Sequence, residues 1–471
     1  MMAGNWSETN KPTLPGFYNR FKTIAENRVT AGTDGVLAMP VKANWGPIKT
    51  VTSVADESDL IDKFGSENTA YKLGRLALLG QPKELLLYRL VDGSEKVAEI
   101  TLKDNGSSPV DVIKIQTKYP TTRKFNITLQ TNLIDSTQKD LLLFEDSKQI
   151  ITIPGLSGKI EDIVSQINSN SENEYLVAEK IKDSTNGLSS IVNQALTGGN
   201  DGSENTDNEA YLKAMTAFEG YDIDGFVLDG ISDTSLQASA KTWTDNQKEN
   251  GNDFCLFVGG SVDIDLDEAN LNSKKLNSLN VVNIGDALYY DGVLYSAAEV
   301  AVYIAALSIG IDLKESVCNK KTIFSKMKTK HSKTERAAAL KAGTLVFDEQ
   351  DGSVVIVDDK NTFTEYTDEK GEVLGYIRAV RFINTVDKDT TLNGVKFEGN
   401  TLNNPTGQLS VISALKQYFE TFENEGIIDS DFTVEIDKAL QATAKNDEFY
   451  WKWNANYINV MKKIFGTGYI K

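Results

Sequence analysis

The sequence has little of the chemistry on which enzymes depend. Among 471 residues there is one histidine, His331, and there are two cysteines, Cys255 and Cys318. A Ser-His-Asp or Cys-His arrangement would have to use His331, but this residue stands in a lysine-rich stretch, which predicts a solvated surface side chain. The cysteines form no Cys-x-x-Cys pair, so neither a disulfide framework nor a structural zinc site is supported. Both are interpreted as buried, reduced thiols.

Long hydrophobic runs are also missing. The longest, 297–311, is interrupted by Glu299 and falls short of the roughly 20 residues that cross a bilayer, so it predicts a buried helix. The N-terminus lacks the basic and then apolar pattern of a signal peptide. Export through the usual secretory route is not indicated, and synthesis is expected to end in the cytoplasm.

Positive charge is in deficit. Lysines and arginines number 49 against 67 aspartates and glutamates, which gives a formal net charge of −18. This balance opposes binding to phosphate backbones or anionic lipid, so no direct contact with nucleic acid or with a membrane is expected. The length exceeds the usual single domain of about 100 to 200 residues and predicts two or three domains.

Two short motifs imitate ligand-binding loops but lack required residues. The stretch 155–159, Gly-Leu-Ser-Gly-Lys, spaces its glycines too closely for a phosphate loop, and Ile160 stands where serine or threonine is needed. It is interpreted as a turn. The alternating aspartates of 263–267 have the spacing that opens a calcium loop, but Glu268 replaces the glycine and Lys274 the final glutamate. They are interpreted as a solvated acidic face.

Three further carboxylates, Asp222, Asp224 and Asp229, flank a predicted strand. They could pair for acid-base work, but aspartates at strand ends are common turn residues, and that interpretation is favoured. An enzyme on an α/β scaffold therefore remains the weaker alternative. No catalytic, cofactor-binding or metal-binding residue is predicted, and no cofactor is expected.

The pattern of apolar residues predicts an α/β multidomain protein with a core sheet flanked by helices. Short apolar strands alternate with amphipathic helices except in one β-rich block, which is bounded by glycine-containing segments interpreted as flexible hinges. The predicted parts are an N-terminal extended arm at 1–25, a discontinuous α/β core at 26–92 and 200–445, a β-rich inserted domain at 93–199 and a C-terminal arm at 446–471.

Within the core, the continuous apolar run 254–258 is typical of a strand in a sheet covered on both faces. The segments 344–347, 354–357 and 376–383 are predicted to form hairpin-like strands, and a helix is predicted over 407–422. The final stretch, 450–460, partly alternates apolar and polar residues, as a half-buried strand does. It is a second exchangeable arm in this interpretation.

Several short motifs follow one another along the chain. They are Pro12–Phe21, Gly35–Pro40, Asn44–Pro47, Glu84–Arg89, Leu196–Gly202, Ala301–Leu307 and Ala338–Val346. In this order they resemble the contractile tail sheath proteins of bacteriophages and phage-tail-like bacteriocins, over nearly the whole chain. No single motif would suffice, because each occurs by chance in many proteins.

The resemblance implies a structural subunit and not an enzyme. Such subunits form a helical stack of six-fold rings around the tail tube, linked by strand exchange through their terminal arms, and contract to drive the inner tube through the target cell envelope. It implies contacts with other copies of the chain, the tail tube protein, and baseplate and tail terminator proteins. The subunit would be made in the bacterial cytoplasm and assembled into the tail of a virion or a bacteriocin particle.

Two sets of residues are expected to make these contacts. The anchors of the inter-subunit arms are Leu14, Phe17, Tyr18, Phe21, Trp451, Trp453, Tyr457 and Ile458. The lysines of the stretch 314–341 concentrate positive charge in an acidic chain, which suggests an acidic partner. The candidate tube contacts are Lys320, Lys321, Lys326, Lys328, Lys330 and Lys333. A solvated face that merely balances local acidity is an equal alternative for this stretch.

A surface adhesin or carbohydrate-binding protein is the other competing reading. It would use the β-rich block as its binding unit, and it predicts a monomer with ligand affinity and an export signal. The missing signal peptide argues against it.

Overall fold

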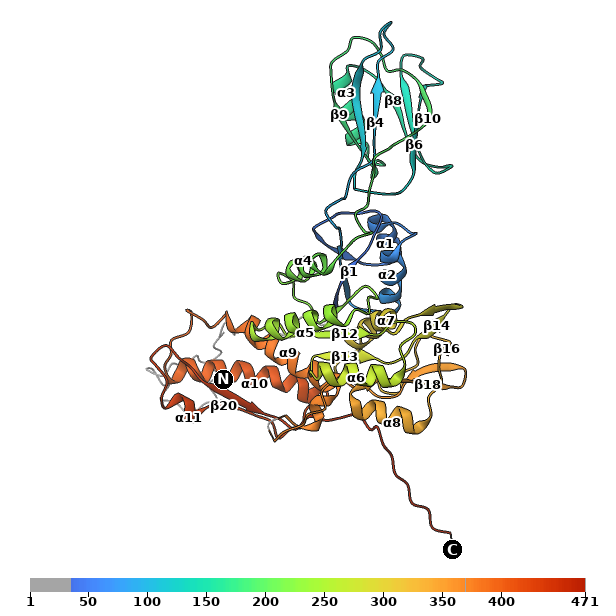
Figure 1. Ribbon diagram of the computed structural model, residues 1–471. Coiled ribbons are helices and arrows are strands. Elements are labelled where there is room, and N and C mark those ends of the chain that lie inside the picture. Colours follow the sequence, from blue (N-terminus) through green and yellow to red (C-terminus); the bar gives the residue numbers. More distant parts are fainter. Residues whose placement is uncertain (1–34, 369, 471) are drawn as a thin grey trace, which may run out of the picture. The chain divides into compact units, whose positions relative to one another are not determined.

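A computed structural model describes residues 35–368 and 370–470 (Figure 1). These residues fall into two compact units, one made of 35–387 with 459–470 and the other of 388–458. The helix α9 (Ile377–Gly394) crosses the boundary between them. The larger unit holds an α/β core and a β-rich block.

The core is built on a seven-stranded sheet in the order β17-β13-β12-β11-β1-β3-β2. The strands are β1 (Val36–Val41), β2 (Val51–Val54), β3 (Glu84–Arg89), β11 (Gly225–Val227), β12 (Cys255–Gly259), β13 (Val281–Ile284) and β17 (Thr344–Leu345). All pair in parallel except β2, which is antiparallel to β3. Every residue of β1 and β12 is buried, which confirms the prediction of a sheet covered on both faces.

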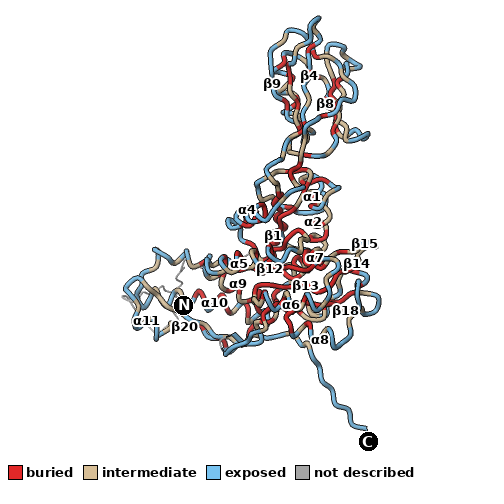
Figure 2. The backbone as a smooth tube through the Cα atoms, in the orientation of Figure 1, coloured by how far each residue is buried: buried red, intermediate tan, exposed pale blue. Residues whose placement is uncertain are grey.

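Helices cover both faces of this sheet. They are α1 (Glu57–Phe64), α2 (Thr69–Leu79), α4 (Asn208–Phe218), α5 (Thr234–Glu249), α6 (Leu266–Leu276), α7 (Ala297–Gly310) and α8 (Lys333–Ala342). One apolar cluster packs α2 and α7 on one face, and another packs α4 and α5 on the opposite face. Buried backbone accordingly concentrates around the central strands and α7 (Figure 2).

Helix α7 is the buried helix that the long apolar run predicted. It starts at a capping box in which Ser296 accepts from the backbone of Glu299 while the Glu299 carboxylate accepts from the backbone of Ser296. Its sides are apolar all round, as expected for a helix enclosed by other elements. At its C-terminal end, the buried guanidinium of Arg381 donates to the carbonyls of Ile309 and Ile311 at 3.1 and 3.0 Å.

The β-rich block is a sandwich of two antiparallel sheets around its own apolar core. One sheet has the order β10-β6-β7-β8 and the other β4-β5-β9. The elements are β4 (Glu99–Lys103), β5 (Asp111–Thr117), β6 (Phe125–Thr131), β7 (Lys139–Glu145), β8 (Lys148–Leu156), α3 (Ile160–Ser169), β9 (Leu176–Lys180) and β10 (Ile191–Ala195). This agrees with the β-rich insertion and its single embedded helix.

One segment differs from its prediction. Residues 376–383 were expected to continue a run of hairpin-like strands but form the start of α9. Eight residues with mostly apolar character fit a buried helix as well as a strand, and the buried side chains of Ile377 and Val380 are three residues apart, as are those of Ala379 and Phe382. The neighbouring hairpin was predicted in part: β18 (Phe347–Gln350) pairs with β19 (Ser353–Ile356), but of the predicted first strand, 344–347, residues 344–345 form β17 of the core sheet.

The smaller unit contains the rest of α9, α10 (Pro405–Asn424), α11 (Lys438–Gln441) and a two-stranded sheet of β20 (Thr433–Ile436) and β21 (Trp451–Asn454). Helix α10 confirms the helix predicted at 407–422. Its N-terminus is capped by Asn404, with Pro405 at the first helical position.

Candidate assembly interfaces

The predicted N-terminal anchors Leu14, Phe17, Tyr18 and Phe21 lie outside the described residues. The four C-terminal anchors are described, and the structure holds them within the smaller unit.

Trp451 and Trp453 lie on β21, opposite Ile436 and Val434 of β20. The Trp453 ring packs against Phe419 of α10 with 5.0 Å between centroids. Tyr457 and Ile458 continue the association beyond the strand: Tyr457 bridges Ile428, and the Ile458 amide donates to the Ile427 carbonyl at 2.9 Å. The alternating apolar residues that predicted a half-buried strand therefore find their partners within the same chain.

The chain rejoins the larger unit at Lys462, which sequence reasoning missed. The Lys462 ammonium lies 2.7 Å from Asp358 Oδ1, also contacts Asp359, and sits 3.6 Å from the centroid of the Tyr376 ring. Its side chain is 12% exposed. Burial alone would lower the pKa of Lys462, but the charges of Asp359 and Asp358 raise it, so the ammonium stays charged.

Beyond Lys462 the side chains turn to solvent. Ile464, Phe465, Tyr469 and Ile470 are each more than four-fifths exposed. Large apolar side chains gathered on an exposed terminal segment mark an interaction surface. The apolar residues that follow Lys462 in the sequence were the available signal.

A buried arginine joins the core to the β-sandwich. Arg89, at the end of β3, donates to the carbonyls of Gly46, Pro120 and Asp201 at 2.7, 2.8 and 3.0 Å. Burial lowers its pKa to about 10, partly opposed by Asp201 and Glu95, so it remains a cation at neutral pH. One side chain thus ties a turn of the core to the loop between β5 and β6 and to the segment through which the chain leaves the sandwich.

Trp45 reinforces this joint from the core side. Only 2% of it is exposed, and its ring belongs to the apolar core of the sandwich, 5.5 Å from Phe125 and 5.3 Å from Tyr119. The Arg123 guanidinium lies 4.9 Å from the Trp45 ring and is held by Glu145. The glycine-rich segments at this joint, expected to be flexible hinges, are cross-linked, since the Asp92 amide donates to Gly202 O at 2.7 Å.

Most of the candidate tube-contact lysines already have partners. Lys320 pairs with Glu315 at 2.5 Å, Lys328 with Asp263 at 2.7 Å and Lys330 with Glu349 at 2.5 Å. Lys326 lies 5.8 Å from the centre of the Tyr289 ring.

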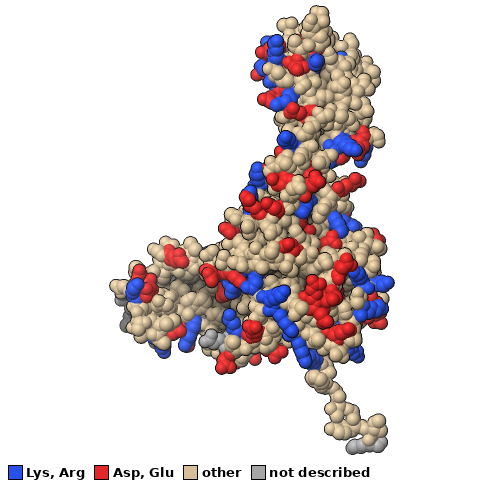
Figure 3. Space-filling view, in the orientation of Figure 1, with Lys and Arg blue, Asp and Glu red and all other residues tan. Residues whose placement is uncertain are grey.

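Lys321 and Lys333 have no carboxylate within 4 Å in the described part of the chain. On the face drawn in Figure 3, basic side chains lie beside acidic ones. Lys326 also lacks such a carboxylate but faces the Tyr289 ring, so Lys321 and Lys333 are the candidates with neither an ion pair nor a ring contact among the described residues.

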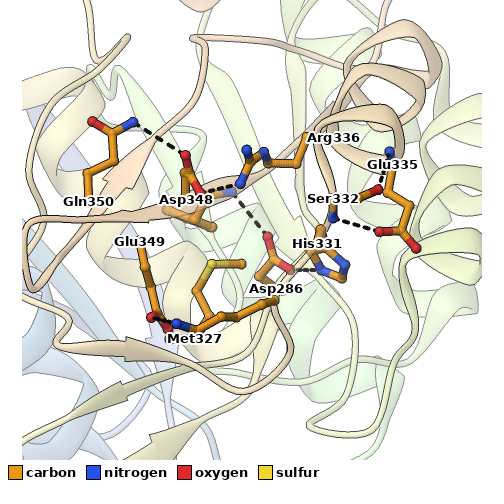
Figure 4. Close-up of polar contacts among 11 residues, drawn as sticks. Asp286, Met327, His331, Ser332, Glu335, Arg336, Asp348, Glu349 and Gln350 are labelled. Atoms are coloured by element: carbon orange, nitrogen blue, oxygen red, sulfur yellow. Dashed lines mark hydrogen bonds and ion pairs between the residues drawn. The ribbon is translucent and has the colours of Figure 1, made fainter.

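His331 differs from its prediction. Instead of a solvated side chain, it is 9% exposed and its Nε2 lies 2.6 Å from Asp286 Oδ1 (Figure 4). Asp286 follows β13 in the fold and also accepts from the Phe347 amide at 3.1 Å. The hydrogen bond to Asp286 raises the pKa of His331, against the opposing effect of burial. The lysine-rich neighbourhood in sequence gave no hint of this partner, which comes from 45 residues away.

A cavity of about 400 Å³ borders this pair, at the carboxyl ends of β12 and β13. Its walls include Asp263, Asp265 and Asp267, the alternating aspartates of the sequence. Asp265 has a structural task, because it caps α6 by accepting from the Glu268 amide. Within the described residues, no group of three or more histidine, cysteine, aspartate or glutamate side chains is arranged to hold a metal ion.

The strand-end aspartates also have structural partners. Asp224 accepts from the amides of Gly35 and Val36 at 2.6 and 2.9 Å. Asp229, expected at a surface turn, is buried and accepts from the Tyr211 hydroxyl at 2.7 Å, and burial raises its pKa to about 7.

Cys255 is buried and Cys318 is partly buried, and both are free thiols. No helix among the described residues combines the length and apolar character needed to span a membrane.

Comparisons with known proteins account for this architecture. Family models match consecutive segments: the N-terminal region of tail sheath domain III at 35–90, the phage tail sheath beta-sandwich domain at 91–201, the central domain at 204–362 and the C-terminal domain at 369–471. Together they define a phage tail sheath protein. The chain belongs to the phage tail sheath family.

Relatives and solved structures agree with this assignment. The chain is similar to the uncharacterized protein YqbK of Bacillus subtilis (strain 168), with 24% identity covering 93% of this chain and 94% of the relative. It is similar to the phage-like element PBSX protein XkdK of the same organism, with 22% identity covering 97% and 100%. The fold matches the sheath tail protein of Desulfitobacterium hafniense with a TM-score of 0.71 at 19% identity, covering 94% of this chain and 100% of that one. It also matches the sheath of an extracellular contractile injection system in its contracted state, with a TM-score of 0.56 at 10% identity, covering 98% and 99%.

Proposed function

We propose that this protein polymerises helically around a tail tube and contracts to drive that tube through the envelope of a target cell. Its partners would be further copies of the chain in six-fold rings, the tube protein, and the baseplate and terminator proteins. It would act without catalysis or a cofactor, be made in the bacterial cytoplasm and be released in a virion or bacteriocin particle. The observation that carries the proposal is the succession of four sheath domains over 35–471.

Strand exchange through the terminal segments would link the subunits. Within residues 35–368 and 370–470, β20 pairs with β21 on one side and with no strand on the other, so a sheet edge is present to accept a strand. The segment after Lys462 presents exposed Ile464, Phe465 and Tyr469. About nine residues, extended at about 3.3 Å each, reach about 30 Å from the anchor. That is enough to bridge to a neighbouring subunit.

This arrangement separates two roles at the C-terminus. Trp451, Trp453, Tyr457 and Ile458 would build the accepting sheet, and the residues after Lys462 would be the donated arm. The contacts within one chain support this division, because the first group is held by α10 and β20 and the second is exposed.

Electron microscopy of negatively stained, purified chain tests the proposal. Hollow striated tubes are expected from the full chain at high concentration, and folded but unpolymerised subunits are expected after deletion of 463–471. A matched deletion of the exposed loop residues Leu133 and Ile134 controls for loss of surface apolar side chains, and it should leave tubes intact. Normal tubes from the chain lacking 463–471 would contradict donation by this arm.

Tube attachment would use the uncompensated lysines. Because Lys321 and Lys333 lack carboxylate partners among the described residues, their charges would be available to an acidic tube surface. The remaining candidates, Lys320, Lys326, Lys328 and Lys330, would contribute only if contact with the tube displaced their present partners.

A further inference from the structure

Strand β9 lies at the edge of its sheet. Along this edge, every second residue points its backbone N–H and C=O groups away from the neighbouring strand β5. On the inner side β9 pairs with β5, and the inward groups are those of odd-numbered residues: Lys118 donates to Tyr175 O, and the Ile181 amide donates to Val112 O. The backbone groups of Leu176 and Ala178 therefore point outward, where another strand could pair with them.

Two asparagine side chains occupy these outward groups. Asn168, near the end of α3, accepts from the Ala178 amide at 2.8 Å and donates to the Ala178 carbonyl at 2.9 Å. Asn173, in the loop before β9, accepts from the Leu176 amide at 2.9 Å and donates to the Leu176 carbonyl at 3.0 Å. Each carboxamide thus makes the pair of hydrogen bonds that a neighbouring strand would make.

The next outward residue is protected differently. Lys180 carries a charge that lies 3.2 Å from Asp183 and 3.5 Å from Glu161. A lysine on an edge strand opposes pairing because its charge would have to be desolvated or matched. All three outward positions of β9 are therefore blocked, although the strand itself has exposed apolar residues such as Val177.

We infer that Asn168 and Asn173 close the β9 edge of the sandwich to pairing with another subunit. By occupying this edge they prevent association of subunits through β9. Blocking of the edge follows from the hydrogen bonds alone, whereas its role in directing strand exchange to the β20–β21 sheet rests on the proposed function. A chain that assembles through open sheet edges needs its other edges closed, since pairing at the wrong edge would make disordered aggregates.

The test compares full-length variants by light scattering after size exclusion, at a concentration at which the parent chain is monomeric. The double variant Asn168→Ala/Asn173→Ala should have at least twice the particle mass of the parent chain. Asn170→Ala is the matched control, because the Asn170 side chain accepts from the Glu172 amide in the same loop but does not touch β9. It should remain monomeric.

A third variant separates edge pairing from unfolding. Adding Val177→Lys to the double variant puts a charge on the exposed face of β9 without changing its core, so it should restore the monomer by repulsion between paired strands. The inference is overturned if the double variant stays monomeric with a native melting curve, or if Val177→Lys fails to reverse its association. Absence of tubes from the parent chain would contradict the proposed function. The masses of the variants would still decide whether the two asparagines block pairing at β9.

Discussion

The ammonium group of Lys462 is held 2.7 Å from the Asp358 carboxylate, beside Asp359 and the Tyr376 ring. This contact fixes the point at which the C-terminal segment leaves the folded core. Before it, Trp451 and Trp453 pair and pack within the chain, whereas Ile464 and Phe465 after it are exposed.

Lys462→Met should destabilise the larger unit by about 3 kcal/mol, because removing one partner of a buried ion pair leaves uncompensated carboxylates. Urea unfolding measures the change. Lys463→Met, at the adjacent exposed position, is the control and should have little effect. Equal stabilities of the two variants would show that the ion pair does not anchor the segment.

Trp45→Ala should cost about 3 to 5 kcal/mol, the usual range for deleting a large buried aromatic side chain. The loss should appear at the joint, since the ring packs in the core of the sandwich. Limited proteolysis should then cut faster at 92–94 and 198–202. Trp45→Phe keeps part of the packing, so its loss of stability and its rate of cleavage should lie between those of the parent chain and of Trp45→Ala. An unchanged rate of cleavage in Trp45→Ala would contradict a packed joint.

The pH dependence of stability should include a contribution from His331. Its hydrogen bond to Asp286 raises its folded pKa above the unfolded value of about 6.5. The folded state therefore binds the proton more tightly, so this stabilisation is fully present below pH 6.5 and is lost as the pH rises through the folded pKa.

Because His331 is the one histidine of the chain, its imidazole NMR signal can be followed without ambiguity. The signal should titrate above pH 6.5, with Asp286, Glu335 and Arg336 as the charged groups that act on it. In His331→Gln the dependence of stability on pH above 6.5 should become flatter. A midpoint at or below 6.5 would refute the ion pair.

Lys321→Glu/Lys333→Glu should weaken co-sedimentation with assembled tube protein while leaving self-assembly unchanged. Both charges lack a carboxylate partner in the described part of the chain, so reversal creates repulsion at an acidic surface without breaking an internal pair. Lys274→Glu/Lys275→Glu, in the last turn of α6, is a control with the same change of charge. Equal binding by both double variants would favour a merely solvated face.

The core was predictable because its sequence signals are local. The apolar run at 254–258 and the apolar helix beginning at Ala297 each identify a buried element without knowledge of its neighbours. The segment 376–383 was misassigned because its length and composition suit two structures. Partners distant in the chain could not be predicted: nothing near His331 points to Asp286, and nothing near Lys462 points to Asp358.

The hydrogen bond between Asp92 and Gly202 places the two ends of the β-sandwich within one peptide's reach of each other, beside the buried Arg89. A segment whose ends meet can be exchanged for another without altering the path of the surrounding chain. The sheath core can thus serve as a repeating scaffold for a guest domain spliced at this position, and a tube of such subunits would display the guest once per subunit along its length.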